Sequence, residues 1–314
     1  NAGNSIESGG NYNTVVGDEA GTAITTGDNN TAVGAVAGTA ITTGLQNTLI
    51  GALAGDALTD ADFNTALGFQ ALSAAITSDG NTAIGRYALL SDTQGNLSVA
   101  VGRDALRAQN MGSDLDAYNT AVGAIAGTAI TTGVANTLIG GLAGDALTDA
   151  DYNTAVGFSS LTSDTLGSRS TALGYFALKT QNFTTATDAY NTGLGFAAGE
   201  AITTGTLNTL IGALAGDALT TGGSNVAVGQ SALSSDTLGS TSIAIGQNAL
   251  VTQNFTTATN VYNIAVGKSA GESITTGIQN TIIGGLAGDS LTDADNNISI
   301  GFGSLSTDTL GSAS

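Results

Sequence analysis

A five-residue pattern of alternating apolar and polar positions recurs along the chain in the form Asn-Thr-Ala-Val-Gly. Its seventeen copies run from residues 13–17 to residues 297–301. The glycines that close successive copies keep one constant spacing in thirteen intervals, as at Gly17, Gly34 and Gly51, and the other three intervals, such as Gly102 to Gly123, are four residues longer. A fixed period of this length is typical of solenoid proteins, in which each repeat buries its apolar side chains against the next one.

The second and fourth positions of the pattern carry residues that are typical of β-strands. The fourth is Val, Ile or Leu in all seventeen copies, and the second is Thr in twelve copies and Val or Ile in five. Because these two positions point to the same side of a strand, we expect that side to face the interior of the coil. On this interpretation, Ile139→Asp buries an unpaired charge and breaks the stack locally.

The other three positions also predict contacts between coils. The third is Ala in ten copies, is never charged and points away from the second and fourth, so we expect a second buried side, covered by another coil surface or another chain. The first is Asn in all copies except Ser98, Ser170 and Ser242, which predicts a ladder of side-chain hydrogen bonds. The invariant closing glycine predicts a positive φ or a close approach of the next coil.

Beyond each closing glycine, the coil carries one large apolar residue in one of two places, and we call this residue the plug of the coil. It is either a Leu four residues on, as at Leu72 and Leu89, or an Ile or Leu seven residues on, as at Ile41 and Leu58, where Gly stands at the first place. This exchange of positions indicates a narrow core of fixed volume. Turns rich in Thr, Asp and Gly follow.

These features predict an all-β fold, namely a β-solenoid or β-roll of about 17 coils. Most are 17-residue coils, and a 21-residue coil recurs with a 72-residue period, since such coils end at Gly123, Gly195 and Gly267. We expect residues 1–314 to form a single repeat array. Because the sequence shows no capping helix or atypical end repeat, we also expect either a slice of a longer fibre or subunits that stack end to end.

The composition argues against several classes of function. A net charge of −19 argues against binding nucleic acid or anionic membranes, and no apolar run reaches the length of about 20 residues that a membrane helix needs. The chain has no Cys and no His, so thiolate metal sites, disulfides and the commonest general base are missing. Its acidic residues follow the repeat instead of interrupting it. We therefore expect no enzyme, no catalytic residues and no cofactor.

Calcium ions and ice are two candidate ligands of the turns. Asp56, Asp60 and Asp62 recur as Asp145, Asp149 and Asp151 and as Asp289, Asp293 and Asp295. Oxygen-rich turns can hold Ca²⁺, but the set that begins at Asp217 loses two of its acids, so plain turns are the preferred interpretation. Paired threonines such as Thr42 and Thr43 occur only about once per set of coils, which is too sparse for an ice-binding array.

Each 21-residue coil has four additional residues, which we expect to bulge from one side of the array. Met111, Phe183 and Phe255 stand at matching places on these loops and are the candidate loop contacts. The interpretation we favour is that they fold back as plugs or pack against a neighbouring chain. Asn182 and Asn254 each begin an Asn-Phe-Thr glycosylation sequon.

The Asn-Thr-Ala-Val-Gly and Ser-Ile-Ala-Ile-Gly repeats, with Ala three residues after the closing glycine, resemble the head repeats of YadA-type trimeric autotransporter adhesins. They are also similar to repeat regions of some phage tail fibres. The resemblance implies a left-handed β-roll, three chains packed side by side, and strands that are apolar on both faces. The coils of this chain are longer than those usual in the family.

From these observations we expect an extracellular structural fibre or filament protein at the cell surface. Its partner would be a second copy of itself, in a trimer or a filament, with no nucleic acid and no membrane insertion. The alternative is a receptor-binding or adhesin segment of an autotransporter or phage tail fibre, whose side loops contact a cell-surface receptor or glycan. An enzyme such as a glycan lyase ranks third, because it needs a non-repeating cluster of acids.

Overall fold

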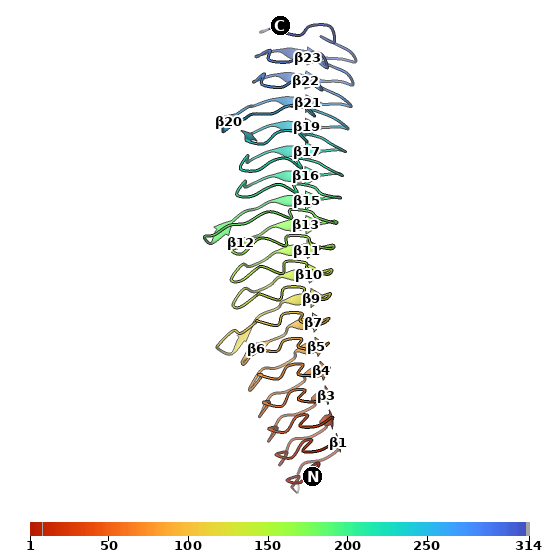
Figure 1. Cartoon of the computed structure of the whole chain (residues 1–314), viewed down its shortest axis with the longest axis vertical. Helices are drawn as coiled ribbons and strands as arrows, with labels where there is room; N and C mark the ends of the chain where they lie inside the picture. The colour runs from red at the N-terminus through yellow and green to blue at the C-terminus, as the bar shows by residue number, and fades with distance from the viewer. Residues whose placement is uncertain (8, 312–314) are drawn as a thin grey trace. The chain divides into compact units, whose positions relative to one another are not determined.

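The computed structural model describes residues 1–7 and 9–311, and this part of the chain consists of β-strands and turns without a helix. It forms two compact units, Asn1–Asn153 and Thr154–Ser314. In each unit the chain winds into stacked coils with one strand of three residues per coil (Figure 1). The expected class, an all-β solenoid with coils of about 17 residues, is therefore confirmed. The expectation of one array over residues 1–314 stays a prediction.

The first unit contains eight strands of the main ladder. They are β1 (Thr14–Val16), β2 (Thr31–Val33), β3 (Thr48–Ile50), β4 (Thr65–Leu67), β5 (Thr82–Ile84), β7 (Val99–Val101), β9 (Thr120–Val122) and β10 (Thr137–Ile139). Successive strands are parallel and in register, so that Thr48 pairs with Thr65 and Ile50 with Leu67. Each position of the repeat thus forms a column that runs from coil to coil.

The second unit contains nine strands of the same kind. They are β11 (Thr154–Val156), β13 (Thr171–Leu173), β15 (Thr192–Leu194), β16 (Thr209–Ile211), β17 (Val226–Val228), β19 (Ile243–Ile245), β21 (Ile264–Val266), β22 (Thr281–Ile283) and β23 (Ile298–Ile300). The same parallel register holds across the 21-residue coils, since Leu173 pairs with Leu194 and Ile245 with Val266. The four additional residues of these coils therefore leave the main ladder undisturbed.

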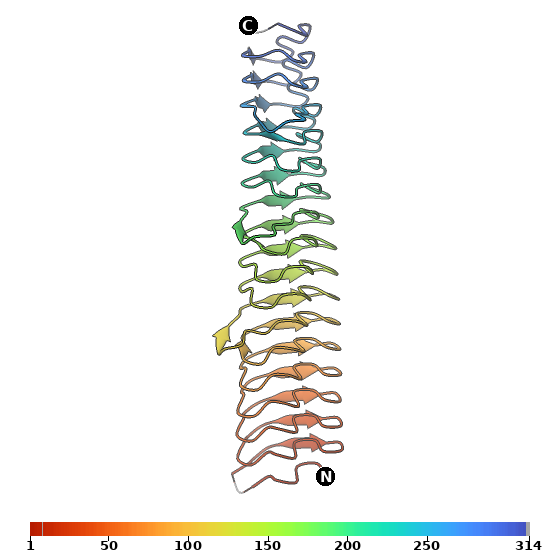
Figure 2. The ribbon, with the colours of Figure 1, turned by 60° about the vertical axis from the view of Figure 1, so that its left-hand side comes forward.

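The long coils accommodate their additional residues in short parallel pairs beside the main strands, which Figure 2 shows from a second direction. The first unit has β6 (Gly95–Asn96) paired with β8 (Leu115–Asp116). The second unit has β12 (Gly167–Ser168) paired with β14 (Thr187–Asp188), and β18 (Gly239–Ser240) paired with β20 (Thr259–Asn260). The expected bulge thus keeps backbone pairing to the preceding coil.

The face of the strands that points into the coil is the opposite of the one expected from the sequence. In β10 the third-position residue Leu138 is fully buried, whereas the fourth-position residue Ile139 is 39% exposed. The third position is buried in every main strand from β2 to β23, and the fourth position is half-buried or exposed in every one. The prediction that the second and fourth positions face the interior was wrong, and a charge at Ile139 would lie on the surface.

The physical reason is that the coil is narrow and the large residues on its other side fill most of it. A Cβ added to Gly38 would lie 2.8 Å from Cδ1 of the third-position Leu49 and 2.9 Å from Cδ1 of Ile41. The third position and the plug therefore meet in the centre, and most coils have room only for Ala opposite the plug. The plugs themselves were predicted correctly, since Ile41, Leu58, Leu72 and Leu89 are all fully buried.

Asparagine and glycine connect the coils as the sequence predicts. The backbone N–H of Asn47 donates to Asn30 Oδ1 at 2.9 Å, and the amide of Asn47 donates to Asn30 Oδ1 at 3.0 Å and to the carbonyl of Ala61 at 2.7 Å. The closing glycines have φ between +125° and +144°. A Cβ on Gly229 would lie 2.5 Å from the carbonyl oxygen of Gly246 in the next coil, so only glycine fits there.

Candidate interaction surface

The outward side of the main strands carries an uncharged stripe of aliphatic side chains. We call the column of fourth-position residues the outer ladder of each unit. In the first unit it comprises Val16, Val33, Ile50, Leu67, Ile84, Val101, Val122 and Ile139, and in the second Val156, Leu173, Leu194, Ile211, Val228, Ile245, Val266, Ile283 and Ile300. Since the strands pair in register, these side chains form a continuous stripe within each unit.

The second-position residues lie beside the outer ladder on the same face and widen it. They are mostly Thr, but β17, β19 and β21 carry Val226, Ile243 and Ile264, and Ile243 pairs with Val226 on one side and with Ile264 on the other. Neither column contains a charged residue in any copy. An exposed apolar surface that extends over many coils in this way marks an interaction site more often than a solvated face.

Aromatic rings border the outer ladder in the second unit. Phe158, Tyr175 and Phe196 each follow a closing glycine, and all three are exposed. The ring centroids of Phe158 and Tyr175 are 5.8 Å apart at an interplanar angle of 17°, and those of Tyr175 and Phe196 are 5.5 Å apart at 2°. The rings thus stack along the column, which extends the apolar surface.

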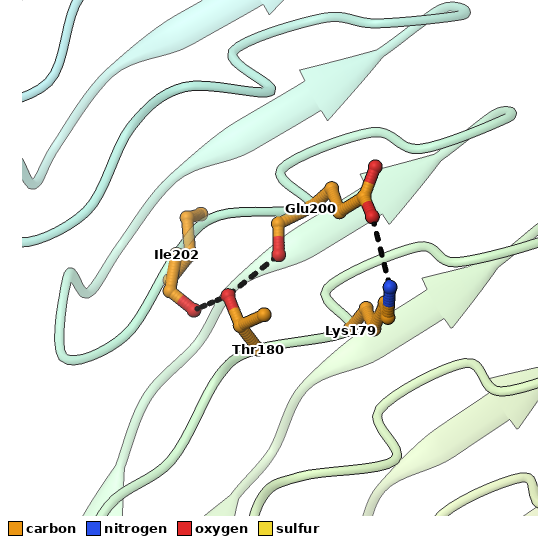
Figure 3. A network of polar contacts seen from close by, with 4 residues as sticks. All are labelled: Lys179, Thr180, Glu200 and Ile202. Atoms are coloured by element: carbon orange, nitrogen blue, oxygen red, sulfur yellow. Dashed lines mark hydrogen bonds and ion pairs between the residues drawn. The ribbon is translucent and has the colours of Figure 1, made fainter.

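A polar network next to these rings ties a long coil to the coil that follows it (Figure 3). The hydroxyl of Thr180 donates to the carbonyl of Glu200 at 2.6 Å and lies 3.0 Å from the carbonyl of Ile202. Lys179 Nζ pairs with Glu200 Oε1 at 3.1 Å and lies 3.9 Å from the ring centroid of Phe176. These contacts fix the start of the long-coil loop against its neighbour.

The three loop residues singled out from the sequence are largely covered. Met111, Phe183 and Phe255 are 8%, 5% and 7% exposed. A Cβ on Gly167 would lie 2.7 Å from Cδ2 of Phe183, which shows how closely the ring packs onto the preceding coil. Their placement agrees with folding back as plugs. The sequon residues Asn182 and Asn254 are exposed on the same loops.

A buried polar cluster at each long coil was missed in the sequence analysis. In the first unit, Gln109 Nε2 donates to Asp92 Oδ2 at 2.5 Å and to Ser98 Oγ at 3.0 Å, while Asn119 Nδ2 donates to Gln109 Oε1 at 3.0 Å. The backbone N–H groups of Gly95 and Met111 donate to Asp92 Oδ1 at 3.0 and 3.3 Å. The Gln109 side chain thus occupies the place where the asparagine ladder has only a serine.

The cluster recurs twice in the second unit with the same geometry. Its members there are Asp164, Gln181, Ser170 and Asn191, and then Asp236, Gln253, Ser242 and Asn263. The signal available in the sequence is that each Ser of the asparagine column is followed by a Gln at the same distance, as Ser98 is by Gln109. This repetition indicates a structural role, because a catalytic site would interrupt the repeat.

The aspartates of the turns accept hydrogen bonds from neighbouring coils. Asp149 Oδ1 accepts from the hydroxyls of Thr131 at 2.7 Å and Thr132 at 2.8 Å, and these donors hold the pKa of Asp149 below its usual value. By contrast, burial and the nearby Glu200 carboxylate raise the pKa of Asp217, whose Oδ1 is buried without a hydrogen bond. The turn carboxylates at these two places of the repeat thus differ in their hydrogen-bond partners.

The residues that the structure describes form no metal site, pocket or membrane-spanning helix. Residues 1–7 and 9–311 contain no group of three or more His, Cys, Asp or Glu residues placed to hold a metal ion. The same residues enclose no detectable pocket. Nor does this part of the chain include a helix long and apolar enough to cross a membrane.

Comparison of the chain with protein-family models, with curated proteins and with solved structures finds no match.

Proposed function

We propose that the chain is an extracellular structural fibre protein whose copies associate side by side through their outer ladders. The observation that supports this proposal is the uncharged aliphatic surface on the outward side of both units. Exposed aliphatic side chains gain roughly 25 cal/mol per Å² when they leave water, so a surface of this extent favours a covering partner. A second copy presents the same surface.

The regular spacing of the outer ladder suits a second copy better than an unrelated protein. Side chains in each column repeat at about 4.8 Å, the distance between paired strands. Two copies therefore match each other over many coils once a single coil is aligned. The resemblance to YadA-type head repeats suggests three chains in such an assembly, and the closure of three outer surfaces around one axis would shield all of them.

The mechanical role rests on the contacts between coils. Within each unit, each coil is joined to the next by strand pairing, by the asparagine ladder and, at the long coils, by the Asp–Gln–Ser–Asn cluster. Local opening of a coil has to break all of these contacts together. We infer that the chain serves as a stiff, protease-resistant shaft.

The second candidate function is a receptor-binding or adhesin segment of an autotransporter or phage tail fibre. It is favoured by surface residues that depart from the repeat, above all the basic residues Arg86, Arg103 and Arg107. A pure spacer has no need of them. The two candidates are compatible if the shaft presents a binding patch.

The test of side-by-side association is sedimentation velocity of the full chain, with negative-stain electron microscopy of the same sample. We expect a dimer or larger oligomer, and a shift toward the 30.5 kDa monomer in Ile211→Lys, since the charge would lie in the outer ladder of the second unit. The matched control is Thr204→Lys, which adds the same charge at an exposed turn.

A wild-type chain that sediments as a 30.5 kDa monomer at tens of micromolar would refute the proposal. So would an Ile211→Lys variant that remains as oligomeric as Thr204→Lys. Uniform filaments in the micrographs would support the fibre role, whereas short isolated rods would favour the segment of an adhesin or tail fibre.

A further inference from the structure

The basic residues of this acidic chain are unevenly distributed. Of the six in the sequence, Arg86, Arg103 and Arg107 lie on two successive coils of the first unit. Arg86 and Arg103 each follow a closing glycine, and the strands before them, β5 and β7, pair in register. The two arginines are therefore neighbours in one column. Two like charges one coil apart repel each other, so this arrangement has a cost that the repeat does not require.

An aromatic ring orients two of the three guanidinium groups. Arg86 Cζ lies 4.4 Å from the ring centroid of Tyr87, and Arg107 Cζ lies 5.2 Å from it. Phe69 packs beside the same ring, with centroids 5.7 Å apart and an interplanar angle of 58°. Cation–π contacts hold guanidinium groups in position without neutralising their charge, so their N–H donors stay available for an anion.

A single carboxylate lies among these arginines. Arg103 Nη1 pairs with Asp104 Oδ2 at 2.6 Å, and Arg107 Nη1 lies 3.7 Å from Asp104 Oδ1. Arg86 forms no ion pair with any of the residues that the structure describes. Three positive charges thus face one negative charge, which leaves an excess of two on the surface of a chain whose net charge is −19.

We propose that this arginine cluster, Arg86, Arg103 and Arg107, binds an acidic polysaccharide through its carboxylate or sulfate groups. Guanidinium groups offer planar pairs of donors that match the oxygens of such anions. The rings of Phe69 and Tyr87 supply an apolar surface on which a sugar ring can lie. The proposal goes beyond the structural role described above and does not depend on it.

The form of the surface favours a polysaccharide over other anions. The described residues enclose no pocket for a small molecule, so the ligand lies across an open surface, as a polymer does. Double-stranded DNA carries one charge per about 1.7 Å and would be repelled by the surrounding acidic coils. An acidic polysaccharide has a lower charge density, and the cluster offers cations one coil, or about 4.8 Å, apart.

The test is binding of the full chain to immobilised polygalacturonate, which carries carboxylates, and to immobilised heparin, which carries sulfates, with neutral dextran as a blank. We expect salt-sensitive binding to at least one acidic polymer and none to dextran. Arg86→Ala and Arg107→Ala should each weaken binding about tenfold, as expected for the loss of charge-assisted hydrogen bonds. Arg86→Lys keeps the charge but loses the paired donors and should also bind more weakly than wild type.

The matched control is Arg169→Ala, which removes an exposed arginine paired with Asp188 at 3.0 Å in the second unit. It changes the net charge equally and should bind as wild type does. The proposal is overturned by equal binding to dextran, by tighter binding to double-stranded DNA, or by equal losses in Arg86→Ala and Arg169→Ala. A changed sedimentation coefficient of Arg86→Ala would also overturn it, because the cluster would then be a contact between copies.

Discussion

The side-chain amide of Gln109 donates a hydrogen bond of 2.5 Å to the buried carboxyl group of Asp92, which lies in the preceding coil. The same amide group continues the asparagine ladder, since its oxygen accepts from Asn119. One glutamine thus closes the gap that Ser98 leaves in the ladder and satisfies a buried acid. Asn119 in turn donates to the carbonyl of Gly133 in the following coil, so the long coil is tied to the coils on both sides of it.

This relationship predicts that Gln109→Ala destabilises the chain although it removes no charge. The substitution removes the side-chain donor to Asp92 Oδ2 and one of the two acceptors of Asn119 Nδ2, and an unsatisfied buried polar group costs about 1–3 kcal/mol. Chemical denaturation measures the loss. The control is Gln247→Ala on an exposed face, which should change the unfolding free energy by less than about 0.5 kcal/mol. Equal effects of the two substitutions would contradict the assignment.

A second prediction concerns the closing glycines. Gly229→Ala should destabilise the chain by at least about 2 kcal/mol, because the added methyl group meets the carbonyl of Gly246 and φ is +138°. Gly112 has φ +63° but nothing within 4 Å of its added Cβ, so Gly112→Ala should cost only about 1 kcal/mol. Thermal unfolding followed by circular dichroism compares the two variants. The prediction fails if Gly112→Ala is the more destabilising.

The pH dependence of Asp149 tests the contacts between turns. The hydroxyls of Thr131 and Thr132 hold the pKa of Asp149 below its usual value. These hydrogen bonds therefore stabilise the folded state fully above about pH 3.9, the usual pKa of an aspartate. The stabilisation is lost as the pH falls through the lowered pKa. In Thr132→Val the pKa should rise toward its usual value. An NMR titration of the Asp149 carboxyl measures this change, with Thr204→Val as the control. An unchanged pKa in Thr132→Val would show that its hydroxyl does not donate in solution.

Asp217 should behave in the opposite way. Burial raises the pKa of Asp217, and the Glu200 carboxylate adds to the effect. The folded state therefore binds the proton of Asp217 more tightly than the unfolded state does. The free energy of unfolding falls as the pH rises through the raised pKa, because the carboxyl group then has to ionise in its buried place. Asp217→Asn should therefore raise the unfolding midpoint at pH 7 and leave it unchanged at about pH 3. The control is Asp56→Asn, where the wild-type carboxylate already accepts from Ser73 at 2.6 Å. A lower midpoint for Asp217→Asn at pH 7 would contradict this account.

Much of the fold could be predicted because the repeat makes each position visible seventeen times. The strands, the glycine that closes them, the buried plugs and the asparagine ladder each correspond to one column with a narrow choice of residues. A single coil would not have distinguished Ile41 from any other apolar residue in a turn. The alternation between Leu72-type and Ile41-type plugs was visible only because many coils could be compared.

Which face of the strands is buried could not be predicted from the sequence, because the usual link between residue size and burial is reversed here. The interior opposite the plugs has room mostly for Ala, whereas the larger Val, Ile and Leu of the fourth position lie outside. The rule that large aliphatic residues lie in the core therefore selects the wrong face of these strands. The Asp92 cluster was missed for another reason, since its members come from two successive coils and only the Ser98–Gln109 spacing connects them.

The measurement that tests the account most directly compares Leu138→Asp with Ile139→Asp, two changes at consecutive residues of β10. Leu138 is fully buried, so Leu138→Asp should lower the unfolding free energy by more than about 3 kcal/mol. Ile139→Asp should unfold within about 1 kcal/mol of wild type but sediment as a 30.5 kDa monomer, because its charge lies in the outer ladder. If instead Ile139→Asp unfolds the chain while Leu138→Asp is tolerated, or if Ile139→Asp leaves association unchanged, the account is contradicted.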